Sequence, residues 1–226
     1  MLERPFAVII AAGGASTRLG EFKPLAWLGD RPLISYALDC AFDISPRVYV
    51  LLNSRPQADR LSGIMRGSDA SIIFDRGTLP FPGSLPESMA QVEEEMLFLM
   101  GCDTPFLDNR LPHLLLPKLK GCGAVVPVWP NGYAEPMAAL YLKSHLPLGK
   151  IIPNLKSLAL AMNAIFIEIA TLGIEPASFF NINRPSDFEL AETMLKNLAK
   201  NDARSLRTYG KMAMSAHKIM KAPFLI

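Results

Sequence analysis

Short apolar runs alternate along the chain with longer amphipathic segments. The apolar runs have the length of buried strands, and the amphipathic segments repeat with the spacing of helices. We expect strands at 6–12, 47–52, 70–74, 96–100, 123–128, 136–142 and 164–169. We expect helices at 32–41, 57–65, 84–95, 111–119 and 185–200. This alternation is typical of a mostly parallel sheet with helices on both faces, so an α/β protein with a Rossmann-like three-layer α/β/α sandwich is predicted.

The length and charge of the chain suggest one domain with a short appendage. The chain has 226 residues, of which 50% are hydrophobic and 19% are charged, so it can bury a sizeable hydrophobic core. We predict a single domain over 1–200 and a basic C-terminal tail over 201–226. Residues 203–226 contain five basic residues and no acidic one, which leaves the rest of the chain slightly acidic. The body therefore lacks the charge excess of a nucleic-acid-binding protein, and the tail is either solvated or contacts a partner.

The location of the protein is suggested by three features. No apolar run approaches 18 residues, so no transmembrane helix is expected. Residues 1–12 lack the cleavage site of a signal peptide and run directly into the first predicted strand. The cysteines are odd in number (Cys40, Cys102 and Cys122) and form no C-x-x-C pair, which favours reduced, buried thiols over disulfides or a zinc site. A cytoplasmic protein is predicted.

A glycine-rich loop follows the first predicted strand. It reads Ala11-Ala12-Gly13-Gly14-Ala15-Ser16-Thr17-Arg18-Leu19-Gly20, with Lys23 close behind. Consecutive glycines let backbone N–H groups approach phosphate oxygens, and the two basic side chains can neutralise a polyphosphate. The spacing matches neither the Walker loop nor the G-x-G-x-x-G fingerprint, which disfavours a dehydrogenase. An ordinary tight turn also explains a glycine pair, but the basic residues in the same loop favour a phosphate site.

Three polar residues come directly after other predicted strands. Asn53 follows 47–52, Asp75 follows 70–74, and Asp103 follows 96–100 after two residues. Ligands bind beyond the carboxyl ends of parallel strands, and Mg²⁺ prefers one or two carboxylates together with substrate phosphates and water. Taken in isolation, each of the three is also explained as a turn or capping residue.

Several segments resemble one family in the same order along the chain. Gly13–Lys23 is similar to the signature A-G-G-x-S-x-R-M-G-x-x-K, and Cys102–Leu107 is similar to C-D-x-P-F-L. Ala134–Tyr141 resembles E-P-L-x-A-x-Y, and Asn181–Phe188 resembles N-x-N-T-P-x-D-L. These signatures belong to the molybdenum cofactor guanylyltransferases, the MobA family of Mg²⁺-dependent nucleotidyltransferases, whose fold is of the nucleotide-diphospho-sugar transferase type. The resemblance covers roughly residues 6–200.

The resemblance implies roles for individual residues. Asp103 would be the ligand of a Mg²⁺ cofactor. The implied catalytic residues are Arg18, Lys23 and Asp103. The implied nucleotide-binding residues are Ala11, Ala12, Gly13, Gly14, Lys23, Asn53, Asp75 and Asp103. Glu135 is a further candidate that would face the acceptor or a second metal, or would simply be a carboxylate at a strand edge. Asn183 is a further candidate near the active site, since its amide can bond backbone or phosphate groups.

The reaction implied by the resemblance is the transfer of GMP from GTP to molybdopterin, with release of pyrophosphate. GTP and molybdopterin are then small-molecule partners, and cofactor-delivery proteins or apo-molybdoenzymes are the protein partners to consider. The sequence departs from the family at Gly83–Glu87, where G-P-L-A-G usually helps to seat the nucleotide. Three alternatives therefore stay open: a cytidylyltransferase acting on the same cofactor, a guanylyltransferase acting on a small phosphorylated acid, and a nucleotide-binding adaptor without catalysis. Gly13 favours the guanylyl branch over the cytidylyl branch, which tends to have alanine there.

Overall fold

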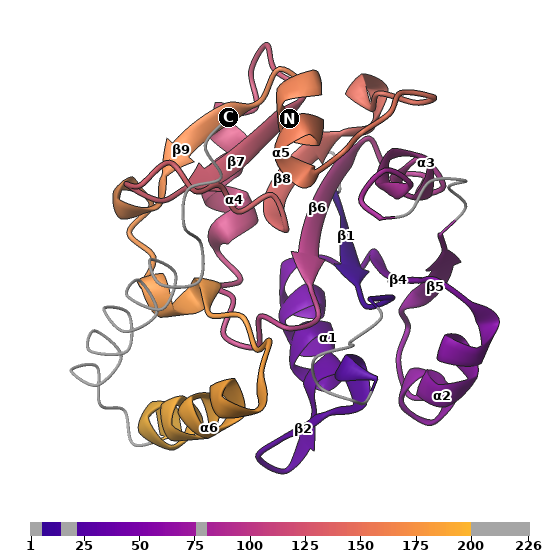
Figure 1. The fold of residues 1–226 in the computed structure, drawn as a ribbon, viewed down its shortest axis with the longest axis vertical. Coiled ribbons are helices and arrows are strands. Elements are labelled where there is room, and N and C mark those ends of the chain that lie inside the picture. The colour runs from indigo at the N-terminus through magenta and orange to yellow at the C-terminus, as the bar shows by residue number, and fades with distance from the viewer. Residues whose placement is uncertain (1–5, 15–21, 76–80, 200–226) are drawn as a thin grey trace.

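The computed structural model describes residues 6–14, 22–75 and 81–199 (Figure 1). Two sequence predictions lie outside these ranges. One is the role of Arg18 in the glycine-rich loop, and the other is the basic tail over 201–226. Within the described ranges, no helix has the length and apolar character needed to cross a membrane.

A seven-stranded sheet runs through the centre of the molecule, with strand order β5-β4-β1-β6-β8-β7-β9 (Figure 1). All neighbours in this sheet pair in parallel except β8, which runs antiparallel to β6 and to β7. The predicted, mostly parallel sheet is therefore confirmed. The strands are β1 (Phe6–Ala11), β4 (Val48–Leu52), β5 (Ser71–Phe74), β6 (Met96–Gly101), β7 (Ala124–Val128), β8 (Ala138–Leu142) and β9 (Ile165–Glu168).

Helices cover both faces of this sheet because its central strands are apolar on both sides. On one face, Val8 and Ile10 of β1 join a buried cluster with residues of α1 (Leu33–Ile44), α2 (Arg55–Met65) and α4 (Leu111–Leu115). On the other face, Ala7 and Ile9 join a second cluster with residues of α3 (Leu85–Met89) and α5 (Leu155–Ala161). The predicted three-layer arrangement follows from this division.

A third buried cluster connects the segment after the glycine-rich loop to the last described helix. It joins Leu28 of β2 (Trp27–Leu28) to Ile182 and to Met194 of α6 (Pro185–Ala199). The short hairpin of β2 and β3 (Arg31–Pro32) lies near α6 at the lower end of the view (Figure 1). This packing brings the segment after the glycine-rich loop close to the segment that begins α6.

Most predicted elements are present, but two expected helices are shorter than predicted and one observed helix was not predicted. The helix expected over 84–95 ends at Met89, because the glutamates at 93–95 would be unfavourable near the negative end of the helix dipole. The helix expected over 111–119 becomes a 3₁₀ turn from Leu116, where Pro117 cannot donate a helical hydrogen bond. Helix α5 was not expected, although its capping residue Asn154 accepts a hydrogen bond from the backbone N–H of Ser157 at 2.9 Å.

Candidate active site

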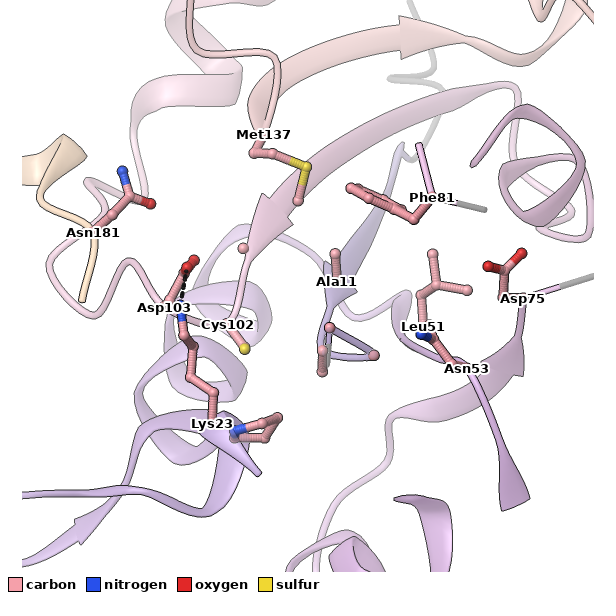
Figure 2. Close-up of a pocket in the computed structure, with 15 residues that line it drawn as sticks. Ala11, Lys23, Leu51, Asn53, Asp75, Phe81, Cys102, Asp103, Met137 and Asn181 are labelled. Atoms are coloured by element: carbon pink, nitrogen blue, oxygen red, sulfur yellow. Dashed lines mark hydrogen bonds and ion pairs between the residues drawn. The ribbon is translucent and has the colours of Figure 1, made fainter. Parts of the chain in front are cut away.

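A cleft of about 550 Å³ opens at the carboxyl ends of β1, β4 and β6. Figure 2 shows Lys23, Asp103 and Asn181 at one side of this cleft, and Asn53, Asp75 and Phe81 at the other. The lining residues are Ala11, Ala12, Gly13, Gly14, Lys23, Pro24, Leu51, Asn53, Asp75, Phe81, Gly101, Cys102, Asp103, Met137 and Asn181. The cleft thus gathers every described residue predicted for the nucleotide.

Lys23 and Asp103 form an ion pair at the side of the cleft that also holds Asn181. The Nζ atom of Lys23 lies 2.9 Å from Oδ2 of Asp103 and donates a second hydrogen bond to Oδ1 of Asn183 at 3.0 Å. The two charged side chains are 16% and 23% exposed, so they are partly shielded from water yet open to a ligand. Residues separated by 80 and 160 positions in the sequence therefore meet at one ammonium group.

The backbone around Asp103 explains why its carboxylate is held there. The carbonyl of Asp103 accepts a hydrogen bond from the N–H of Ile182 at 2.9 Å, which ties the end of β6 to the segment before α6. A β-carbon placed on Gly101 would lie 2.4 Å from Oδ1 of Asp103. The glycine that ends β6 thus leaves room for this carboxylate, a requirement that the sequence pattern alone did not reveal.

The opposite side of the cleft is built by the ends of β4 and β5. Asp75 follows β5, and its two carboxylate oxygens accept hydrogen bonds from the hydroxyls of Ser84 at 2.7 Å and Ser88 at 2.9 Å. Ser84 belongs to the stretch that departs from the family signature. The departure therefore supplies a donor that orients one of the predicted nucleotide-binding groups, and sequence reasoning had not identified either serine.

The two further candidates differ in position. Asn183 is in direct contact with Lys23 and so belongs to the ion-pair side of the site. Glu135 is buried, accepts a hydrogen bond from the indole Nε1 of Trp129 at 2.7 Å, and is absent from the described residues that line the cleft. Its neighbour Met137 lines the cleft, as does Asn181.

A covalent mechanism through cysteine has no support in this site. Cys102 lines the cleft but is only 5% exposed, and burial raises the pKa of its thiol well above the usual range. A nucleophilic cysteine needs the thiolate form, which a positive or polar environment has to favour. Cys102 therefore stays protonated at neutral pH and acts as packing at the end of β6.

Comparison with known proteins decides the family. Residues 8–159, more than half of the chain, match the family model of the MobA-like NTP transferase domain. A protein of Pyrococcus furiosus named probable molybdenum cofactor guanylyltransferase is 30% identical over 201 residues, covering 83% of this chain and 96% of that protein. The chain belongs to the MobA-like NTP transferases.

Two further MobA-like comparisons agree with this assignment. A Bacillus subtilis protein named probable molybdenum cofactor guanylyltransferase is 26% identical over 204 residues, covering 85% of this chain and 98% of that protein. The crystal structure of molybdopterin-guanine dinucleotide biosynthesis protein A from Archaeoglobus fulgidus superposes with a TM-score of 0.71 at 23% identity. That match covers 85% of this chain and 100% of the other, and it confirms the predicted Rossmann-like fold class.

The MobA-like site suits a metal ion that is held jointly with substrate. Among the described residues, no group of three or more histidine, cysteine, aspartate or glutamate side chains could cage a metal ion. Mg²⁺ usually binds through one or two carboxylates and completes its shell with substrate phosphates and water. Two described carboxylates line the cleft, on Asp75 and on Asp103, and the carboxylate of Asp103 beside Lys23 fits this second mode of binding.

Gly13→Ala is expected to weaken nucleoside triphosphate binding about tenfold, which corresponds to roughly 1.4 kcal/mol. A β-carbon on Gly13 would lie 2.1 Å from Oδ1 and 2.8 Å from the backbone nitrogen of Asn53, so the loop or the end of β4 must shift. Titration calorimetry with a nucleoside triphosphate measures the effect. The matched variant is Gly63→Ala in α2, which lies outside the described residues that line the cleft; its β-carbon would meet none of the described residues within 4 Å, so binding should change little. Equal effects of the two substitutions would show that the contact with Asn53 is unimportant.

Proposed function

We propose that this protein transfers GMP from GTP to molybdopterin carrying its molybdenum and releases pyrophosphate. The relatives named molybdenum cofactor guanylyltransferase support the substrates, since they match over nearly their whole length. The observation that carries the proposal is the meeting of Lys23, Asp103 and Asn183 at one side of a cleft whose other side holds Asn53 and Asp75. This arrangement suits a reaction that needs charge compensation at one end of a nucleotide and recognition at the other.

The reaction is a substitution at phosphorus. A phosphate oxygen of the acceptor attacks the α-phosphorus of GTP, the bond to the β-phosphate breaks, and pyrophosphate leaves with the electron pair. Such a transfer depends on alignment and electrostatic stabilisation more than on a protein nucleophile. The described residues supply these needs without a covalent intermediate.

Each part of the cleft has a role in this proposal. The backbone N–H groups of Gly13 and Gly14 bind phosphate, while Asn53 and Asp75 hold the nucleoside. Lys23 offsets charge on the triphosphate and on the departing pyrophosphate. Asp103 would hold Mg²⁺, which when bound neutralises and polarises the phosphate oxygens.

The position of Arg18 in the proposed scheme follows from the sequence motif. It would add a second positive charge over the phosphates, with the planar guanidinium suited to bidentate phosphate contacts.

We also propose that the reaction takes place in the cytoplasm, because the three cysteines are free thiols and free thiols persist in reducing compartments. The acceptor would then be received from, or passed to, cofactor-delivery proteins or apo-molybdoenzymes.

Titration of the protein with GTP, CTP, ATP and UTP, each with and without Mg²⁺, tests the proposal. Selective binding of GTP that Mg²⁺ strengthens is the expected result, and transfer of label from GTP to molybdopterin then identifies the acceptor. Preference for CTP would replace the guanylyl assignment by the cytidylyl one. That second candidate stays open because Ser84, which bonds the carboxylate of Asp75, belongs to the stretch that departs from the family signature. Binding of a nucleotide without transfer to any acceptor would leave the nucleotide-binding adaptor, and failure to bind any nucleotide would reject all three.

A further inference from the structure

We infer that Gln57 is a positioning residue that fixes Gly13, at the start of the glycine-rich loop, against the end of β4, and this inference rests on the proposed function. Its side-chain amide spans the two segments. The Nε2 atom donates to the carbonyl of Gly13 at 3.0 Å, and Oε1 accepts a hydrogen bond from the backbone N–H of Asn53 at 2.8 Å. Gln57 is absent from the described residues that line the cleft, so it acts through Gly13 and Asn53 and does not touch the substrate.

The hydrogen bonds of Gln57 lie directly beyond the last backbone hydrogen bond between β1 and β4. The backbone hydrogen bonds between β1 and β4 extend as far as Ala12, whose N–H donates to the carbonyl of Leu51 at 3.0 Å. At Gly13, one residue beyond Ala12 and outside β1, the connection to the end of β4 passes through the side chain of Gln57. The link therefore extends the sheet's rigidity into the loop just where the regular ladder ends.

The geometry of the peptide unit makes the link directional. The carbonyl of Gly13 and the N–H of Gly14 belong to one planar trans peptide, so the two groups point in opposite directions. Fixing the carbonyl of Gly13 toward Gln57 thereby fixes the direction of the Gly14 N–H, one of the groups assigned to phosphate. A Gly13–Gly14 peptide held in this orientation before the nucleotide arrives avoids part of the ordering cost of binding.

A simpler role must be separated from this one. Gln57 is the third residue of α2 after the cap Ser54, and glutamine at that position commonly reaches back to stabilise the start of its own helix. The bond from the Asn53 N–H is of this kind. The bond to the carbonyl of Gly13 does not stabilise the start of α2 in this way, because it joins α2 to the segment that follows β1. The test must therefore remove the second bond and keep the first.

Gln57→Glu makes that separation. The carboxylate still accepts from Asn53 and is favourable near the positive end of the helix dipole, but it cannot donate to Gly13. We expect KM for GTP to rise about five- to tenfold, with kcat within about twofold, because binding is lost equally in the ground and transition states. The thermal midpoint should be unchanged or higher. Gln57→Met, which loses both bonds, should raise KM similarly and lower the thermal midpoint.

A matched variant controls for the added charge. Ser54→Asp places a carboxylate at the same end of α2, where the native serine side chain makes no capping hydrogen bond, and leaves Gln57 intact. Its KM for GTP should stay close to that of the wild type. If Gln57→Glu bound GTP like the wild type, or if Ser54→Asp raised KM as much while Gln57→Met did not, the inference would be overturned. Wild-type protein that binds no nucleotide would overturn the proposed function as well, so the two failures are distinguishable.

Discussion

Replacing Asp103 by asparagine is expected to lower kcat/KM for nucleotidyl transfer by about a thousandfold, the upper range for removing one electrostatic group from a reaction centre. Asparagine has nearly the same shape, so the cleft should keep its form and the fold should be preserved. What is lost is the negative charge that the proposed Mg²⁺ requires and that holds the ammonium group of Lys23 at 2.9 Å. The loss should appear mainly in kcat, because the missing interaction matters most when charge develops at phosphorus.

Steady-state kinetics over a range of Mg²⁺ concentrations, together with thermal unfolding, measure this effect. The matched control is Asp108→Asn in the same loop, whose carboxylate pairs with Arg110 at 2.6 Å and lies outside the residues that line the cleft. The control should retain nearly full activity. Full Mg²⁺-dependent turnover by Asp103→Asn would show that the metal assignment is wrong.

Lys23→Met is expected to lower kcat/KM by about a hundredfold, or roughly 2.7 kcal/mol of transition-state stabilisation. Methionine keeps most of the side chain's length but removes the charge that would offset the triphosphate and the departing pyrophosphate. The ammonium group also holds Asp103 and Asn183 together, so its loss should loosen that side of the cleft. Lys118→Met is the control, because Lys118 is exposed in a 3₁₀ turn away from the site.

The double variant Lys23→Met/Asp103→Asn sharpens this prediction. Residues in direct contact have non-additive effects, so the double variant should lose less activity than the product of the two single losses. Fully multiplicative losses would show that the contact between Lys23 and Asp103 has no influence on the reaction. An unchanged kcat/KM in Lys23→Met would remove this lysine from the mechanism altogether.

The fold could be predicted in outline because the central strands are unambiguous. Strands such as β1 and β6 are apolar along almost their whole length, which fits only strands buried on both faces. Asn53 and Asp103 could be found because strand ends in such a sheet are the places where ligands bind. The antiparallel direction of β8 could not be predicted, since the apolar pattern of a buried strand does not depend on its direction.

The residues of the site that the sequence did not predict were missed for one physical reason. Gln57, Ser84 and Ser88 act by hydrogen bonds to groups 9 to 44 residues away, and no local periodicity encodes such meetings. The close approach of the Asp103 carboxylate to Gly101, two residues earlier, becomes evident only when the direction of that side chain is known. The sequence thus identified the residues that line the cleft better than the groups that hold them in place.

The central position of β1 has a consequence for synthesis of the protein. This strand is the first described element of the chain, yet its pairing with β6 joins Phe6 to Met96. At a synthesis rate of about 5–20 residues per second, the apolar β1 waits roughly 5–20 s for that neighbour. During this interval the nascent chain carries an unsatisfied hydrophobic edge, and such edges invite aggregation or capture by chaperones. Among the pairings of the seven-stranded sheet, the one between β1 and β6 spans the longest stretch of sequence, so the strand that later supports the cleft waits longest for its neighbour.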